Sequence, residues 1–432
     1  MLSVAEKIKA LRKAKGINQH KLAEIIYSDV SKVIRVENGE EDYTEIQLQS
    51  IVKHFKIEGL PLTKDDCIAF KQRLYLFMDY LKDRNMIEAS SIHAEIAGIV
   101  KFEPCDPDLP MLFRLFEIVF FLVKNEIATA EKKLLALDDC TDDMTEEQLY
   151  HYYSNMGTLK SMQNKYEEGL GYYQKARVLN EQNNEFMAED GERLYFNIGS
   201  CYTFLELPFR AILFLLKARS IYTEDRAKKF GLHLDSMLAL NYIKANELDE
   251  AGKLLEKCRT QAKCLNNDLF IGYTLRSYGL LCKKLDAWPA AMDYFNQSLK
   301  HCEKGSDYYL GALYQLVRCM IGNKEHRKAK SKLAEIKAAF KDNEAYTISF
   351  ESLYHFSIIS NRITQNNAES VEYIETVTIP YLMKTHDYLE AVDYLQLLEL
   401  HFMKTKKTKK SHQMTKAIRD ILARCFVNEE RR

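Results

Sequence analysis

The chain has 432 residues and a formal net charge of −1, with 61 basic and 62 acidic side chains. Its 16 glycines and 7 prolines make up about 5% of the residues, where about 12% is usual. So few turn-forming residues argue against a β-sandwich, a glycine-rich nucleotide-binding fold and low-complexity disorder, and they favour a nearly all-helical protein.

Four short helices are expected in the first sixty residues. Apolar side chains recur at helical spacing over residues 4–15, and Gly16 stops that helix. Asn18 and Asp29 can cap a second and a third helix, and Thr44 can open a fourth. Because only a few residues join the second helix to the third, the pair has helix-turn-helix geometry. The side chains expected to face inward are Leu22, Ala23, Ile26, Val33, Val36, Ile51 and Val52.

This segment carries a motif of known type. The string I-x-x-L-R-x-x-x-G-x-x-Q-x-x-L-A, followed by V-x-x-V-E-N-G, resembles the helix-turn-helix of phage-repressor-like (Cro/C1-type) regulators. One departure is Tyr27, which occupies the turn position usually held by glycine. The resemblance implies a DNA-binding domain over residues 1–60 that binds a double-stranded operator. It is carried by Ile8, Leu11, Arg12, Gly16, Gln19, Leu22, Ala23, Val33, Val36, Glu37, Asn38 and Gly39.

In such a domain the third helix lies in the major groove. Lysine and arginine can donate to guanine and serine can bond either way, so Ser31, Lys32 and Arg35 are the candidates for base contacts. The resemblance implies that Gln19 donates to a backbone phosphate. The basic first helix, which contains Arg12, suits attraction to phosphates, although an ordinary solvated face is the alternative.

From residue 65 onward the chain repeats itself about every forty residues, which is the signature of a repeat array. A small residue opens the second helix of each unit, at intervals of 38 to 42 residues: Ala89, Ala130, Gly169, Ala211, Ala251, Ala291, Ala329 and Ala368. Upstream lies a crowded position, often small, at Gly157, Gly199, Ala239 and Gly279. Four residues after the opening residue comes a bulky one, at Leu134, Tyr173, Leu215, Leu255, Phe295 and Leu333.

This pattern predicts helical hairpins, because two helices pack closely only where one side chain is nearly absent. Hairpins of this kind stack into a superhelix with a concave groove. The pattern resembles the tetratricopeptide repeat, with a period longer than its usual 34 residues. We therefore expect an all-α protein in which the helix-turn-helix domain precedes a right-handed tetratricopeptide-repeat superhelix of about nine repeats over residues 61–432. Residues 58–64 are the expected linker, and the basic run 404–410 is interpreted as a solvated loop or capping edge, with a nucleic-acid contact as the alternative.

The order of these parts resembles the RRNPP family of quorum-sensing regulators, especially its NprR-like and PlcR-like members. The resemblance implies a cytoplasmic, homodimeric transcriptional regulator whose repeat domain binds a short secreted signalling peptide. A peptide that touches several repeats would fix their curvature and change the spacing of the two DNA-binding domains in the dimer.

An extended peptide needs partners for its backbone, and asparagine suits this because its amide both donates and accepts. In Rap-like and NprR-like relatives, asparagines on the first helices do this work, and Asn155 and Asn197 match that pattern, with Asn241 near the equivalent face. An arginine could fix a peptide carboxylate. The remaining candidates for peptide binding are His233, Tyr273, Arg276 and Arg318.

Catalysis finds little support, because the sequence has no H-E-x-x-H, G-x-S-x-G or Walker-type motif and no Cys/His cluster at metal spacing. We expect neither enzyme activity nor a cofactor or metal. Three alternatives stay open: a Rap-like protein acting on response regulators, an interaction scaffold without specific DNA binding, and a phage-type lysis–lysogeny receptor built from the same parts.

The compartment follows from three features. The most apolar stretch, residues 111–123, contains Arg114 and Glu117 and is too short to span a bilayer. The N-terminus is charged from residue 6 onward, unlike a signal peptide. The ten cysteines form no C-x-x-C pair, which is typical of reduced thiols in a cytosolic protein. We expect no membrane partner.

Overall fold

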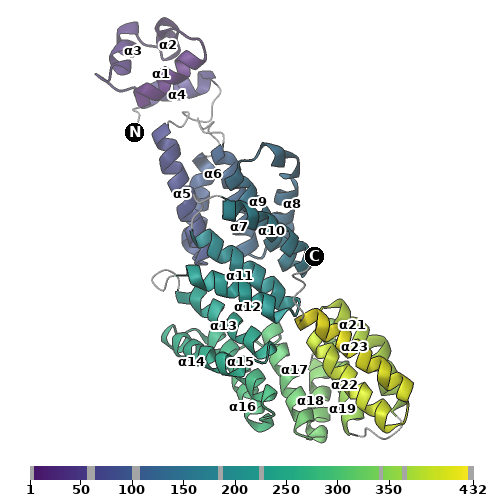
Figure 1. Ribbon diagram of the computed structural model, residues 1–432. Helices are drawn as coiled ribbons and strands as arrows, with labels where there is room; N and C mark the ends of the chain where they lie inside the picture. The colour runs from purple at the N-terminus through teal and green to yellow at the C-terminus, as the bar shows by residue number, and fades with distance from the viewer. Residues whose placement is uncertain are drawn as a thin grey trace. The chain divides into compact units, whose positions relative to one another are not determined.

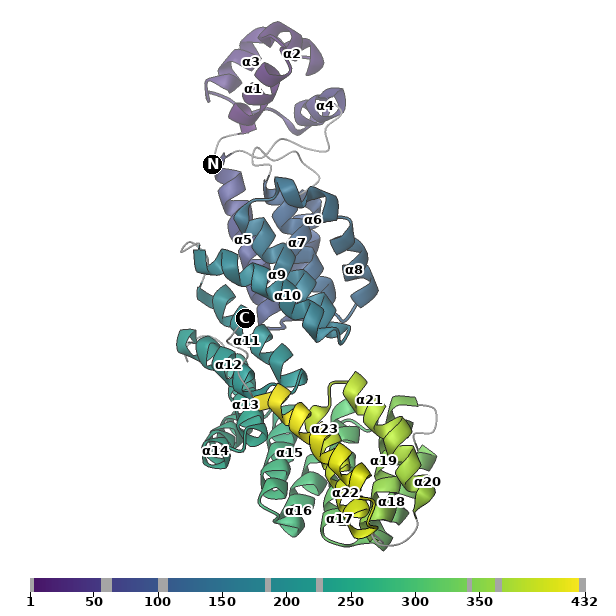
Figure 2. The same cartoon turned by 45° about the vertical axis from the view of Figure 1, so that its right-hand side comes forward.

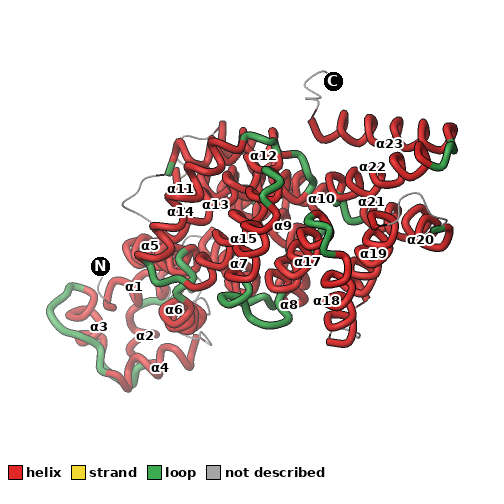
Figure 3. Tube along the Cα trace, turned by 90° about the horizontal axis from the view of Figure 1, so that it is seen from below, coloured by secondary structure: helices red, strands yellow, loops and turns green. Residues whose placement is uncertain are grey.

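The computed structural model describes residues 4–55, 64–99, 108–182, 188–222, 228–339, 344–361 and 367–426. Over these ranges the chain is built from helices and contains no β-strand, so the predicted all-α fold is confirmed (Figures 1 and 3). Within the same ranges, no helix is both long and apolar enough to cross a membrane. The expected linker lies, apart from Lys64, outside the described residues.

The first four helices are α1 (Val4–Ala14), α2 (Gln19–Ile25), α3 (Val30–Glu37) and α4 (Glu45–Phe55). Two predicted caps are present: the side chains of Asn18 and Asp29 accept backbone N–H groups of Lys21 and Lys32 at 2.9 and 2.7 Å. Thr44 likewise accepts the Gln47 N–H at 3.4 Å. The predicted interior is buried except for Val52, which is half-buried, and its fully enclosed members are Leu22, Val33, Val36 and Ile51.

The turn between α2 and α3 contains Tyr27, whose φ is 51° and whose side chain is 91% exposed. This is the left-handed region, which costs a residue with a Cβ about 1–2 kcal/mol relative to glycine. The turn position singled out in the sequence therefore does adopt the conformation that favours glycine, with a tyrosine in place of one.

Beyond residue 64, nine helical hairpins follow one another through the described ranges (Figures 1 and 2). They are α5 (Lys64–Lys82) with α6 (Met86–Ile99), α7 (Asp108–Val123) with α8 (Ile127–Leu135), α9 (Glu146–Met162) with α10 (Tyr166–Gln182), α11 (Ala188–Phe204) with α12 (Pro208–Ile221), α13 (Lys228–Lys244) with α14 (Leu248–Cys264), α15 (Asp268–Lys284) with α16 (Trp288–Ser298), α17 (Asp307–Gly322) with α18 (His326–Ala339), α19 (Glu344–Asn361) with α20 (Ala368–Tyr373) and α21 (Ile379–Lys384), and α22 (Tyr388–Lys404) with α23 (Thr408–Phe426).

The helix crossings confirm the predicted pairing of small and bulky positions. A Cβ placed on Gly157 would lie 2.6 Å from the ring of Tyr173. A Cβ on Gly199 would lie 2.7 Å from Leu215, so neither glycine can be enlarged without moving its neighbour. The opening alanines of six hairpins are fully enclosed: Ala89, Ala130, Ala211, Ala251, Ala291 and Ala329.

The eighth opening residue, Ala368, begins α20 as predicted but does not occupy the buried place that the other opening residues have. Ala368 is exposed, and the buried small residue in α20 is Ser370, two positions later. Serine can take this place because its hydroxyl has a partner, the Nδ1 atom of His355 at 3.0 Å. The predicted basic loop is mostly helical, because α22 ends at Lys404 and α23 begins at Thr408.

The described chain forms two compact units, one made of residues up to 164 together with 171–184, and the other of residues 165–170 and 185–432. In the second unit the first helices of successive hairpins touch in order, α11, α13, α15, α17, α19 and α22. The last hairpin of this unit also returns to its beginning: Phe426 packs on Phe209 with ring centroids 5.8 Å apart, and Arg424 lies 3.3 Å from Glu167. On the first-helix side, Tyr314 and Arg318 of α17 contact Glu390 and Asp393 of α22, so α22 partly covers that face of the unit.

Candidate functional site

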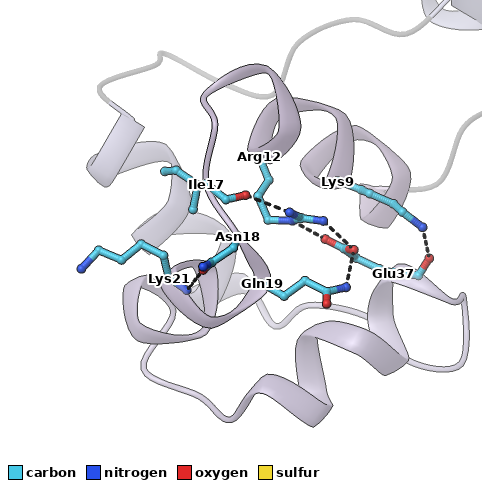
Figure 4. Close-up of polar contacts among 7 residues, drawn as sticks. All are labelled: Lys9, Arg12, Ile17, Asn18, Gln19, Lys21 and Glu37. Atoms are coloured by element: carbon cyan, nitrogen blue, oxygen red, sulfur yellow. Dashed lines mark hydrogen bonds and ion pairs between the residues drawn. The ribbon is translucent and has the colours of Figure 1, made fainter.

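A buried ion pair holds the helix-turn-helix together (Figure 4). The Arg12 guanidinium on α1 donates to both carboxylate oxygens of Glu37 on α3, at 2.7 and 3.0 Å, and also to the carbonyl of Ile17 at 2.8 Å. Gln19 donates its Nε2 to the same carboxylate at 2.9 Å. Burial opposes ionisation of Glu37, but the hydrogen bonds from Arg12 and Gln19 outweigh it and keep the pKa of Glu37 below its usual value.

This geometry changes the role of one predicted DNA contact. Arg12 is only 8% exposed and its donors are committed to Glu37 and Ile17, so we propose that it positions α1 against α3 instead of contacting DNA. Gln19 is half-buried and shares Glu37, and its contact with a phosphate stays a prediction. The sequence could not separate these roles, because both residues belong to the same motif.

The three residues expected to contact bases lie on α3 away from the interior. Ser31 is exposed, and Lys32 and Arg35 are partly exposed, while Val33 and Val36 on the same helix are buried. Sequence reasoning missed Glu41, in the loop that follows. Its carboxylate lies 2.6 Å from Lys32 Nζ and accepts from Arg35 Nε at 3.0 Å, so it joins the two cations.

A continuous row of aromatic rings crosses the first helices of the second unit. His233 on α13 lies between Phe196 on α11 and Phe270 on α15, with ring centroids 4.9 and 5.8 Å away. Phe270 is followed by Tyr273 at 5.6 Å and, on α17, by Tyr308 at 4.1 Å from Tyr273. The structure thus brings the predicted residues His233 and Tyr273 into one row along four helices.

Two further predicted residues lie beside this row. Asn197 follows Phe196 on α11 and is half-buried, and its side chain makes no hydrogen bond within the described part of the chain. Arg276 lies one turn after Tyr273 on α15, against the backbone of Gly311 on α17, where a Cβ would be 3.6 Å from its guanidinium carbon. Its Nε has no hydrogen-bond partner, and burial lowers the pKa of Arg276, since no carboxylate of the described residues offsets the loss of solvent.

Arg318 is in a different situation, because α22 supplies carboxylates to it. Its Nε lies 3.4 Å from Glu390, and its Nη2 pairs with Asp393. Burial lowers the pKa of Arg318, but Glu390 and Asp393 outweigh that and raise it overall. Tyr314 donates its hydroxyl to Glu390 at 2.7 Å, so a peptide carboxylate could bind Arg318 only by exchange with these acids.

The other two predicted asparagines hold helices together. Asn155 is buried in the first unit and donates to the carbonyl of Leu115 on α7 at 2.8 Å. Asn241 is fully enclosed and donates to the Thr203 hydroxyl on α11 at 2.7 Å. In place of a peptide contact we assign both to contacts between neighbouring first helices.

A pocket of about 260 Å³ lies between α18 and α19 in the second unit. Its walls are mainly apolar, and two lysines and one glutamate stand among them. None of the residues predicted to bind a peptide lines it. The residues that line this pocket are Lys330, Leu333, Ala334, Ile336, Lys337, Thr347, Phe350, Glu351 and Tyr354. Across the described residues, no group of His, Cys, Asp and Glu side chains is arranged to hold a metal ion.

Comparison with known proteins agrees with this architecture, although no family model matches the chain. The transcriptional activator NprA of Geobacillus stearothermophilus is 22% identical over 391 residues, which cover 88% of this chain and 94% of the relative. The regulatory protein RapD of Bacillus subtilis (strain 168) is 23% identical over 257 residues, or 56% of this chain and 71% of the relative.

Solved structures show the same fold. The apo form of the quorum sensor NprR from B. thuringiensis has a TM-score of 0.65 at 19% identity and covers 82% of this chain and 98% of its own. A Rap protein complexed with Competence and Sporulation Factor has a TM-score of 0.68 at 15% identity, covering 83% and 98%. NprR in complex with its cognate peptide NprX has a TM-score of 0.62 at 21% identity, covering 82% and 97%.

These observations define a class first: the chain is an all-helical repeat protein with an N-terminal helix-turn-helix, and its sequence relatives are named as a transcriptional activator and a regulatory protein. The chain is similar to NprA over nearly its whole length and shares the fold of NprR and a Rap protein, in agreement with the resemblance of its sequence to the RRNPP family of quorum-sensing regulators.

Proposed function

We propose that this protein is a peptide-responsive transcriptional regulator. Residues 1–60 bind a double-stranded operator, and residues 61–432 bind a short secreted signalling peptide and mediate homodimer formation. The observation that carries the proposal is that one chain contains two binding surfaces. The third helix of the helix-turn-helix presents Ser31, Lys32 and Arg35, and the first helices of the repeat region present a row of aromatic and polar side chains. The NprA relative, named a transcriptional activator, supports it.

On the DNA side, Lys32, Arg35 and Ser31 contact base edges in the major groove, and Gln19 contacts a phosphate. Binding of this kind depends steeply on salt, because each neutralised phosphate releases counterions. Replacing Lys32 or Arg35 with methionine should weaken operator binding and reduce the preference for the operator over other duplexes, because these side chains donate to base edges. Lys53 on α4 is an exposed cation outside α3, and the Lys53→Met variant serves as the control.

On the peptide side, Asn197 pairs with the peptide backbone, His233 and Tyr273 pack against its side chains, and Arg276 binds a carboxylate. Arg276 is the better anion partner, because Arg318 is already neutralised by Glu390 and Asp393. The solved complex of NprR with its cognate peptide NprX supports a peptide ligand for this fold. A peptide on this row contacts α11, α13, α15 and α17 and so limits their relative movement.

The signal reaches DNA through the repeats. Successive first helices touch one another, so a ligand that bridges four of them changes the curvature of the stack. In a homodimer this alters the separation of the two DNA-binding domains, and half-sites must lie about 34 Å apart, one helical turn. The protein acts in the cytoplasm, where DNA and an imported peptide are both available, and it acts by binding and not by catalysis.

Calorimetry tests the receptor function. Synthetic peptides are taken from small reading frames beside the gene and titrated into the full chain and into the Asn197→Ala and Arg276→Met variants. We expect one peptide to bind the wild type and each variant to bind it at least tenfold more weakly, which is about 1.4 kcal/mol. Asn296 on α16 is an exposed asparagine of a second helix, and Asn296→Ala should bind normally. Equal affinity of all three variants would refute the proposed peptide site.

A second candidate function is that of a Rap-like protein acting on response regulators, favoured by the fold shared with a Rap protein and by the partial match to RapD. The two functions differ in whether α3 binds duplex DNA. Loss of operator binding in the Lys32→Met variant supports the regulator, whereas a full chain that binds no duplex but captures a response regulator supports the alternative.

A further inference from the structure

The loop that follows the DNA-contacting helix places one carboxylate on both of its cations. Glu41 Oε2 lies 2.6 Å from Lys32 Nζ, and Glu41 Oε1 accepts a hydrogen bond from Arg35 Nε at 3.0 Å. Lys32 donates further to the carbonyl of Asp42 at 3.0 Å, and only 19% of its side chain is accessible. The two residues expected to contact bases are thus both paired within the chain.

The backbone fixes this carboxylate in place. Gly39 adopts a left-handed φ of 79° after α3, and its N–H donates to the carbonyl of Val36 at 3.0 Å. The next N–H, that of Glu40, donates to the carbonyl of Arg35 at 2.9 Å. A few residues later Tyr43 is buried in the interior of the helix-turn-helix. The loop is anchored on both sides of Glu41, so the ion pairs result from a defined turn and not from a loose surface contact.

A carboxylate and a phosphate compete for the same donors, since both are anions that accept hydrogen bonds from ammonium and guanidinium groups. We propose that Glu41 is a built-in competitor of DNA: it occupies Lys32 and Arg35 in the free protein and has to be displaced by phosphate or guanine oxygens when α3 enters the major groove. The inference rests on the proposed operator-binding function. The hydrogen bond from Lys32 and the nearby Arg35 charge lower the pKa of Glu41, so the competitor is ionised at neutral pH.

Glu40 provides a matched control. It precedes Glu41 in the same loop, carries the same charge, is exposed, and forms no ion pair with any residue that the structure describes. The Glu41→Gln and Glu40→Gln variants therefore change the net charge equally, and only the first removes contacts with Lys32 and Arg35. Any difference between them measures competition and not bulk charge.

The experiment measures binding of the full-length protein to a short, fluorescently labelled duplex of random sequence by anisotropy, over a range of salt concentrations. We expect Glu41→Gln to bind about fivefold more tightly than the wild type, as the loss of two exposed ion pairs implies. The logarithmic salt slope should steepen by about 0.9 if one more phosphate is neutralised. Glu40→Gln should change affinity by less than about twofold, because Glu40 is exposed to solvent and pairs with neither cation.

A double-mutant cycle completes the test. In a background in which Lys32 and Arg35 are both methionine, Glu41→Gln should have no further effect. The proposal is overturned if Glu41→Gln binds duplex no more tightly than Glu40→Gln. It is also overturned if Glu41→Gln binds more weakly than the wild type, because Glu41 would then orient the cations for DNA. A third contrary result is a gain in affinity from Glu41→Gln that persists when Lys32 and Arg35 are both methionine. A wild-type protein that binds no duplex at any salt concentration would instead remove the operator-binding function itself. Circular dichroism confirms that each variant is folded.

Discussion

Replacing Arg12 with methionine separates a structural role from a DNA contact. The substitution leaves the Glu37 carboxylate, 6% exposed, without its two strongest donors. Removing one partner of a buried ion pair costs about 3–5 kcal/mol. A module of the size of residues 4–55 is stabilised by about 3–8 kcal/mol, so the loss is comparable with its whole stability. We expect α1 to α3 to be largely unprotected in the variant.

Hydrogen exchange with mass spectrometry reports each segment of the full chain separately and suits this case, because a repeat protein of this length does not unfold in one step. Peptides from residues 4–55 should lose protection in Arg12→Met, while peptides from α11 to α17 should not change. Lys13 is the next residue on α1 and is exposed, and Lys13→Met is the control. If Arg12→Met retained full protection yet lost DNA binding, the structural assignment would be refuted and the original expectation of a DNA contact restored.

The role of the Arg12–Glu37 ion pair also predicts how the stability of residues 4–55 changes with pH. Glu37 has a lowered pKa in the folded protein, so its contribution to stability is present above its unfolded-state pKa of about 4.3 and is lost as the pH falls through the folded-state value. Arg12→Met removes the strongest of the contacts that lower the pKa of Glu37, while burial still opposes ionisation, so less stability should be lost as the pH falls. The protection that remains over residues 4–55, corrected for intrinsic exchange, should fall less steeply with decreasing pH in Arg12→Met than in the wild type.

Four further substitutions test the packing. Gly199→Val adds atoms at a position where even a Cβ would lie 2.7 Å from Leu215 on α12, so it should destabilise the second unit by about 1–3 kcal/mol in thermal unfolding. A Cβ on Gly171 would meet nothing within 4 Å, so Gly171→Ala should stabilise α10 by about 0.5–1 kcal/mol. Equal effects of the two substitutions would contradict the close helix crossing at Gly199. Tyr27→Gly should relieve the left-handed turn and raise protection of α2 and α3 by about 1 kcal/mol in hydrogen exchange; a loss would show that the ring contributes packing. Arg318→Met leaves the half-buried Glu390 beside another acid, Asp393, and should loosen α22 by about 1–3 kcal/mol. Unchanged exchange of α22 would argue against the ion pair.

The sequence predicted the features that depend on neighbouring residues. Caps at Asn18 and Asp29, the unusual turn at Tyr27 and the crossing of Gly157 with Tyr173 all follow from local spacing, and the structure contains each of them. The forty-residue period also predicted the buried small residue of most units correctly, because an alanine or glycine is required wherever two helices cross. It failed at Ala368, where a serine with a hydrogen-bond partner replaced the small apolar residue.

The partners of polar side chains could not be predicted in the same way. Asn155 binds a carbonyl 40 residues away and Arg318 an acid 75 residues away, and no local pattern records such distances. Neighbouring positions on a helix differ by about 100° in direction, so one residue decides whether a side chain faces a groove or the adjacent helix. Asn197 and Asn241 both belong to first helices, yet the first is half-buried beside an aromatic row and the second is fully enclosed.

The cationic side chains on the first helices of the second unit differ in whether a carboxylate of the protein already binds them. This difference predicts how much each of them contributes to the affinity for an anionic ligand. Lys244 at the end of α13 pairs with Glu206 at 2.5 Å, and Arg318 on α17 pairs with Glu390. An anionic ligand gains little from either, because it has to replace a carboxylate that has already lost its hydration. Arg276 pairs with no carboxylate of the described residues, and burial has already removed much of its solvent. A carboxylate brought to Arg276 therefore restores a missing interaction, whereas one brought to Arg318 only exchanges partners, so the affinity of an anionic peptide should depend more on Arg276 than on Arg318.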